Sequence, residues 1–100
     1  MDVKLVNRGE DGELLLSGDL DTKTAKDAEA LFLQMADRFT NITLNMKDLQ
    51  YISSAGLRSI RNLYMKLMKK GGKLMVSNVN ENVMEVFEMT GLAGLLNIRE

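Results

Sequence analysis

Apolar and polar residues follow two periods along this chain. Five short segments alternate between the two kinds or form a brief apolar run, as half-buried strands do. Three longer segments place apolar residues three and four positions apart, as amphipathic helices do. The pattern predicts strands at 3–6, 13–17, 42–46, 73–77 and 95–98. It predicts helices from just before residue 25 to 39, at 57–70 and at 82–89, giving the order β-β-α-β-α-β-α-β.

Turn residues and core residues refine these elements. Glycines at 9 and 12 predict a hairpin turn, Gly18 is expected to end the second strand, and Gly71-Gly72 to end the second helix. Asp21, Thr22 or Thr24 can each cap the first helix. We expect the apolar faces of the first two helices to bury Ala25, Ala28, Phe32, Met35, Ala36, Phe39, Leu57, Ile60, Tyr64, Leu67 and Met68. The methionines, which include Met65, Met68, Met75, Met84 and Met89, are expected mainly in the core.

Three of the predicted strands carry a polar face. Ile42, Leu44 and Met46 alternate with polar residues, and the strands at 73–77 and 95–98 repeat this pattern. A parallel strand covered on both faces is usually apolar throughout, so one face of this sheet is expected to stay thinly covered. Right-handed crossovers then place the helices chiefly on the other face. The predicted fold is a single α/β domain over residues 1–100, with an N-terminal hairpin followed by parallel strands in one mixed sheet.

Composition narrows the function classes. The 100 residues carry a net charge of −1, which offers no field for nucleic acid. Cysteine and histidine are both absent, so thiolate chemistry and the commonest general base and metal ligand are missing. No apolar run approaches the roughly 18 residues of a transmembrane helix, and the first residues do not open a signal peptide. We expect a cytoplasmic protein with no cofactor, no metal and no membrane insertion.

The stretch from Asp48 to Arg58 joins a predicted strand to a predicted helix through a loop. Ser53 and Ser54 lie where that helix begins, and serine oxygens commonly cap the free N–H groups there. The same helix end favours an anion, so a phosphate on either serine would be stabilised. Arg58 and Arg61 follow in the first turns, where they are either solvated or able to pair with a phosphate.

Three motifs resemble the STAS domain, the module of bacterial anti-sigma factor antagonists and sulfate transporters. The first is Asp-Leu-x-Tyr-Ile-Ser-Ser-Ala-Gly-Leu at 48–57. The second is Gly-Asp-Leu-Asp at 18–21 with Thr24-Ala25, and the third is Phe-Glu-Met-Thr-Gly-Leu at 87–92. In that family the phosphoacceptor serine lies two places before the glycine, and counting back from Gly56 gives Ser54.

The resemblance implies a binding module and no enzyme: an anti-sigma factor antagonist that docks a serine kinase and so frees a sigma factor. A phosphatase is a further partner that this implies. The partner-binding surface would include Asp21, Ser53, Ser54, Ala55, Gly56, Leu57 and Arg58. Two features differ from the family pattern. Ser53 stands where an acidic residue is often found, and the helix that commonly follows the last strand is not present, so a surface is expected to be bare or covered by a partner.

Two other functions fit the sequence. Related modules serve as subunits of lipid transporters or stress-signalling assemblies without being phosphorylated, and Ser53 keeps that alternative open. A small nucleotide-binding protein or enzyme could instead use the helix end at Ser54 as its phosphate site. Against that second alternative, the chain has no Gly-x-x-x-x-Gly-Lys-Ser/Thr loop and no evident general base.

Overall fold

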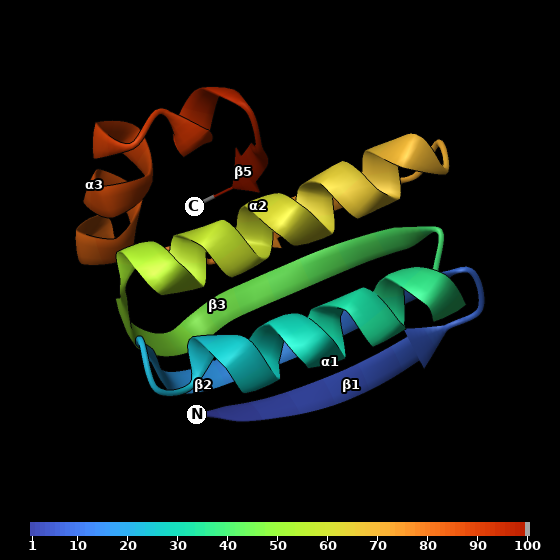
Figure 1. Ribbon diagram of the computed structural model, residues 1–100, viewed down its shortest axis with the longest axis horizontal. Coiled ribbons are helices and arrows are strands. Elements are labelled where there is room, and N and C mark those ends of the chain that lie inside the picture. Colours follow the sequence, from blue (N-terminus) through green and yellow to red (C-terminus); the bar gives the residue numbers. More distant parts are fainter. Residues whose placement is uncertain (100) are drawn as a thin grey trace.

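The computed structural model describes residues 1–99 and forms one five-stranded sheet with helices packed against it (Figure 1). The elements are, in order, β1 (Asp2–Arg8), β2 (Asp11–Leu20), α1 (Ala25–Arg38), β3 (Asn41–Ile52), α2 (Ser54–Lys69), β4 (Lys73–Ser77), α3 (Glu81–Met89), the 3-10 helix η1 (Leu92–Gly94) and β5 (Asn97–Arg99). The strands lie side by side in sequence order. The β1–β2 pair is antiparallel and the other pairs are parallel, so the predicted mixed sheet and element order are confirmed.

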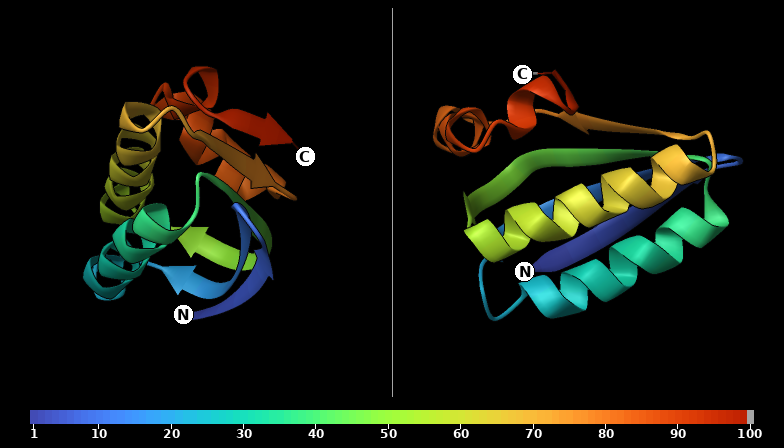
Figure 2. Two further views of the ribbon diagram at one scale, coloured as in Figure 1. Left: turned by 90° about the vertical axis from the view of Figure 1, so that its right-hand side faces the viewer. Right: turned by 45° about the horizontal axis from the view of Figure 1, so that its top comes forward.

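Helices α1 and α2 lie side by side over one face of the sheet, as the crossover rule predicts (Figures 1 and 2). The side chains under them are fully buried, among them Leu14, Leu44 and Val76. Glu13 and Thr43 point to the opposite face and stay partly exposed. The alternation seen in the sequence therefore separates a covered face from an open one.

The two helices are held together by polar contacts as well as by apolar packing. The hydroxyl of Ser59 in α2 is buried and donates to the carbonyl of Ala25 in α1 at 3.1 Å. At the other end of the pair, the ammonium of Lys70 donates to the carbonyls of Ala36 at 2.6 Å and Phe39 at 3.3 Å. Carbonyls at a helix C-terminus lack intrahelical partners, so Lys70 supplies a donor to the end of α1.

The first three strands are longer than the sequence predicts, β2 and β3 most of all. β3 continues through Ile52 where a loop was expected from Asp48, and β2 continues past Gly18 to Leu20. The alternation breaks at Lys47 and Asp48, which are both exposed, and the β2–β3 register shifts at this level and again after Gly18. A bulge inserts a residue and resets which face each side chain takes. β2 and β3 continue to pair after the bulge. A prediction based on strict alternation therefore ends the strands too early.

The second helix buries a slightly different face from the predicted one. Leu63 is fully buried, Tyr64 is half-buried and Met68 is 51% exposed, so the expectation of a core Met68 is wrong. Leu57, Ile60, Leu63 and Leu67 form the inward stripe. Leu57, Ile60 and Leu63 are spaced three residues apart, and this spacing directs the buried stripe toward the sheet. Met68 lies outside that stripe. Met65 and Met89 are exposed too, which corrects their expected place in the core.

The C-terminal elements also shift slightly. Asn80 caps α3 by accepting from Val83 N–H at 2.9 Å, and its own amide donates to the carbonyl of Leu49 in β3. The helix ends before Gly91, as predicted, and Gly91 takes a left-handed φ of 79°. Leu95 lies before β5 and is 48% exposed, which corrects the predicted start of the last strand. Among residues 1–99, none of the helices combines the length and the apolar character that a bilayer crossing requires.

Candidate functional site

The predicted site residues meet where the strands β2 and β3 end. Leu20 and Ile52 are register partners, and the N–H of Ser53 donates to the carbonyl of Leu20 at 2.9 Å. Asp21 and Ser53, the first residues after β2 and β3, therefore lie next to each other. They lie at the edge where open β-α sheets place their sites. The sequence-based placement of Asp21 and the 53–58 stretch at one edge is confirmed.

Ser53 is the residue that caps α2. Its backbone is extended and its hydroxyl oxygen accepts from Gly56 N–H at 3.1 Å, while its carbonyl accepts from Leu57 N–H at 3.0 Å. Ser54 is the first residue inside the helix, and among the amides of the first turn that of Gly56 is bonded to the hydroxyl of Ser53.

Ser54 points its side chain to solvent. It is exposed, and within residues 1–99 no hydrogen bond to its hydroxyl is found. It lines a hollow of about 280 Å³ together with Leu57, Arg58, Arg61, Thr90 and Leu92. A serine hydroxyl at a helix N-terminus with no structural bond is free to react or to contact a partner. Ser53, by contrast, is engaged in the fold.

The rim of this hollow is basic. Arg58 and Arg61 are exposed and belong to the first two turns of α2, whose first turn holds no acidic residue. In the part of the chain that the structure describes, neither guanidinium has an ion-pair or hydrogen-bond partner. Cations are mildly unfavourable at a helix N-terminus, so the fold gains nothing from them there. Two unpaired guanidiniums beside a free hydroxyl make this end of α2 suited to an anion.

The remaining residues of the predicted surface have supporting positions. Gly56 and Leu57 are buried and Ala55 is half-buried. A Cβ at Gly56 would lie 2.8 Å from the carbonyl oxygen of Leu20 and 2.7 Å from its Cγ. The glycine thus allows α2 to approach the backbone at the end of β2.

Asp21 caps the turn that leads into α1. Its Oδ1 accepts from Lys23 N–H at 2.9 Å and Thr24 N–H at 3.0 Å, and its own N–H donates to the hydroxyl of Thr24 at 2.9 Å. These bonds favour the ionised carboxylate: the Thr24 N–H foremost, then the Thr24 hydroxyl and Lys23, lower the pKa of Asp21 below its ordinary value. Of the three candidate caps, Thr24 occupies the N-cap position of α1 without a side-chain cap bond, and Asp21 caps the preceding turn.

Thr90 and Leu92 line the hollow beside Ser54, and the surface predicted from the sequence does not include them. They follow α3 and belong to the 87–92 motif, which the sequence comparison had identified without assigning it to the site. The Thr90 hydroxyl donates to the carbonyls of Val86 at 2.9 Å and Phe87 at 3.1 Å. That motif therefore forms the wall of the hollow that faces α2. The resemblance of residues 87–92 to a family motif was the only sequence signal for it.

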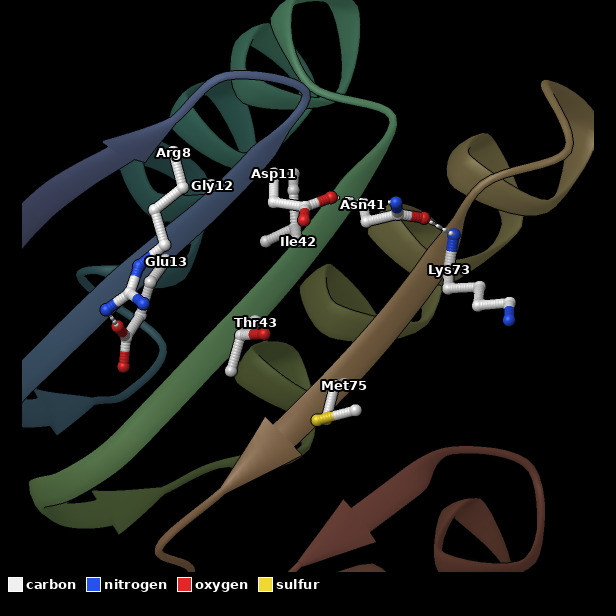
Figure 3. A pocket seen from close by; sticks show the side chains of 9 residues that line it. All are labelled: Arg8, Asp11, Gly12, Glu13, Asn41, Ile42, Thr43, Lys73 and Met75. Carbon is white, nitrogen blue, oxygen red and sulfur yellow. Dashed lines mark hydrogen bonds and ion pairs between the residues drawn. The ribbon is translucent and has the colours of Figure 1, made fainter.

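A larger hollow of about 560 Å³ lies on the open face of the sheet, at the opposite ends of the strands (Figure 3). Most of its polar groups already have partners. Arg8 pairs with Glu13 at 2.9 Å, and the amide of Asn41 donates to Asp11 at 2.8 Å. Because Arg8, Glu13 and Asp11 are bonded to neighbours within the sheet, the smaller hollow at Ser54, whose arginines are unpaired among the described residues, is the better candidate. Within residues 1–99, no cluster of three or more His, Cys, Asp or Glu side chains is placed to hold a metal ion.

The sequence matches the model of the STAS domain family over residues 3–100, and the chain belongs to that family. It is similar to the anti-sigma-B factor antagonist of Bacillus subtilis, with 25% identity over 88% of this chain and 81% of the relative. It is also similar to the anti-sigma F factor antagonist of Paenibacillus polymyxa, with 33% identity over 83% of this chain and 73% of the relative.

The fold is shared with a solved structure of the same class. The anti-sigma factor antagonist SpoIIAA in its unphosphorylated form superposes with a TM-score of 0.77 at 18% identity, over 99% of this chain and 87% of that one. The Bacillus cell fate determinant SpoIIAA in the phosphorylated form gives a TM-score of 0.76 at 20% identity, over 97% and 90% of the two chains. At this identity the likeness establishes the fold.

The structure gives a local role to the residue at position 53. The resemblance leads us to expect an acidic residue there, and Ser53 is instead the N-cap of α2. Serine and aspartate are about equally good N-caps, because both place an oxygen within reach of the N–H two or three residues on. The departure therefore preserves the local structure and removes one negative charge beside Ser54.

Proposed function

We propose that this chain is an anti-sigma factor antagonist: a cytoplasmic binding protein, and no enzyme, that docks an anti-sigma factor and so frees a sigma factor. The support comes from the relatives, two of which are named as antagonists of anti-sigma factors and are matched over most of their length. The docking surface is the edge formed by Asp21, the Ser53–Arg58 stretch and the neighbouring wall at Thr90.

The partner is an anti-sigma factor with serine kinase activity, and Ser54 is its phosphoacceptor. The observation that carries this assignment is the contrast between the two serines: Ser53 accepts from Gly56 N–H, whereas Ser54 is exposed beside two arginines. In the reaction, the Ser54 oxygen forms a bond to the γ-phosphorus of ATP, ADP leaves, and a base of the kinase takes the hydroxyl proton. A phosphatase returns the serine by hydrolysis.

Phosphorylation would switch the surface without unfolding it. The phosphate adds roughly −1.5 to −2 charge at neutral pH to a side chain that faces solvent. In the free protein water solvates that charge. At a protein interface the same charge loses its water, and desolvating a charge is costly, so the modified chain would release its partner. That SpoIIAA has been solved in both forms with this fold supports a switch of this kind.

The test is incubation with the cognate kinase and ATP, followed by mass spectrometry of the peptide that spans both serines. We expect phosphate on the wild type and on Ser53→Ala, and none on Ser54→Ala. Phosphate on Ser53 alone would contradict the assignment. Phosphate on neither serine, together with capture of a transporter or stress-signalling subunit, would favour a STAS module that phosphorylation does not regulate.

A further inference from the structure

Two positively charged side chains, Arg58 and Arg61, line the hollow beside the neutral side chain of Ser54. Arg58 lies one helical turn after Ser54 and Arg61 one turn further, so all three share a face of α2. Residues three apart on a helix bring their Cβ atoms to about 5–6 Å, which lets the two guanidiniums converge on one group. Thr90 and Leu92 close the other side.

We propose that Arg58 and Arg61 form a receptor, within this same chain, for the phosphate on Ser54. The inference rests on the proposed phosphorylation of Ser54 and adds how the chain holds the product. Arginine binds phosphate through paired N–H donors, and charge-assisted bonds of this type are about twice as strong as neutral ones. Both side chains are available, because within residues 1–99 neither has an ion-pair or hydrogen-bond partner.

The cap of α2 already uses one of the amides that a phosphate could reach. The N–H of Gly56 is bonded to the hydroxyl of Ser53. The two guanidiniums are the charged donors that line the hollow, whose volume of about 280 Å³ leaves room for a phosphate and its waters.

This receptor has a measurable consequence. Two neighbouring cations favour the dianion of the phosphate over the monoanion, so they lower its second pKa from the ordinary value of about 6. The modified Ser54 would then keep its full charge below neutral pH. The phosphate would also hold both guanidiniums, which would then no longer be free to contact a partner. One modification would therefore change three side chains of the docking surface: Ser54, Arg58 and Arg61.

The experiment installs phosphoserine at position 54 during translation, which makes it independent of any kinase. The second pKa of the phosphate is followed by phosphorus NMR in the folded protein and in concentrated urea. For the wild type we expect a folded-state pKa lower than the urea value by on the order of half a unit. The double variant Arg58→Gln/Arg61→Gln should remove most of this difference, and added salt should reduce it.

Lys69→Gln is the matched control. It removes one positive charge from the exposed far end of the same helix and should leave the phosphate pKa unchanged. An equal pKa in the wild type and in the double arginine variant, with both folded by circular dichroism, would overturn the receptor. A kinase that leaves Ser54 unmodified would contradict the proposed function instead. If the arginine variants slow phosphorylation but keep the wild-type phosphate pKa, the arginines serve the kinase and the receptor is wrong.

Discussion

Gly56 in α2 packs directly against Leu20 at the end of β2. A Cβ built on Gly56 would lie 2.8 Å from the carbonyl oxygen of Leu20, a distance that real Cβ contacts do not show. That same carbonyl accepts the N–H of Ser53 at 2.9 Å, so it cannot move without disturbing the cap of α2. The glycine thus sets how closely the helix that carries Ser54 approaches the sheet.

We therefore expect Gly56→Ala to destabilise the fold. Forcing a methyl group into a packed contact costs typically 1–3 kcal/mol, and the better helix propensity of alanine returns about 1 kcal/mol. Because the obstacle is backbone, the net loss should reach about 2 kcal/mol in urea unfolding. Gly94→Ala is the control, since a Cβ there meets nothing within 4 Å.

Gly56→Leu should likewise lose stability before it loses partner binding, because the larger side chain meets Leu20. A Gly56→Leu protein that melts with the wild type but fails to bind would show that Gly56 contacts the partner.

The cap of α2 gives a prediction that separates the two serines. Ser53→Ala removes the acceptor of Gly56 N–H and should cost about 1 kcal/mol of unfolding free energy. Ser53→Asp keeps an oxygen in place and should retain most of it. Ser54→Ala is the matched control and should stay within about 0.5 kcal/mol of the wild type, as exposed surface substitutions usually do. A larger loss for Ser54→Ala than for Ser53→Ala would reverse the two roles.

The pattern of the sequence was sufficient for the order of elements and for the covered face of the sheet. Alternation at Ile42, Leu44 and Met46 reports directly which side chains point inward, and the structure buries all three. It could not show that β3 continues to Ile52, because the bulge near Lys47 interrupts the alternation while pairing with β2 continues. Pairing is a long-range property, and a local window does not contain it.

The position of the candidate site in the fold was predictable, and its details were less so. The motif around Gly56 and Asp21 lie at one edge of the sheet, as the sequence predicts. Which serine caps the helix depends on one backbone conformation, the extended state of Ser53, that two adjacent serines do not distinguish in sequence. The contribution of Thr90 needed the fold, since 36 residues of chain separate it from Ser54 while both line one hollow.

Asp21 should make the stability of the fold sensitive to acid. Its bonds to the N–H groups of Lys23 and Thr24 lower its folded-state pKa, so its contribution is present above the unfolded-state value of about 3.9. It is lost as the pH falls through the lower folded-state pKa. Asp21→Asn should then differ from the wild type in urea unfolding midpoint at pH 6, and this difference should shrink below pH 4.

Asp2→Asn, at an exposed position of β1, is the control for this titration and should follow the wild type across the same range. The same Asp21→Asn protein also tests the surface. An asparagine oxygen caps nearly as well, so normal binding of the kinase partner by Asp21→Asn would restrict Asp21 to its capping role.

Lys70 should contribute to the contact between the two helices. Its ammonium bonds to the carbonyls of Ala36 and Phe39 at the end of α1, so Lys70→Met should lower the unfolding free energy by about 1 kcal/mol. Lys69→Met removes the same charge from the neighbouring exposed position and should have a smaller effect. Equal losses in thermal unfolding would mean that only the overall charge of the helix end matters.

The charge on residue 54 should decide partner binding. Ser54→Asp places a carboxylate on the exposed first residue of α2, where the helix dipole favours it, so its circular dichroism spectrum and melting temperature should match the wild type. At the interface that charge is desolvated, and affinity for the kinase should fall on the order of tenfold or more, about 1.4 kcal/mol. The loss should be smaller than that caused by a phosphate, because aspartate carries a single charge.

Ser54→Asn is the control that separates charge from size, because asparagine has the shape of aspartate without its charge. It should bind far better than Ser54→Asp, and Ser54→Ala should bind whether or not ATP is present, since it offers no acceptor. Isothermal titration of the purified kinase domain with the three variants measures these differences. If Ser54→Asn and Ser54→Asp weaken binding equally, residue 54 acts through the size of its side chain. If all three variants bind the kinase with the affinity of the wild type, Ser54 lies outside the interface.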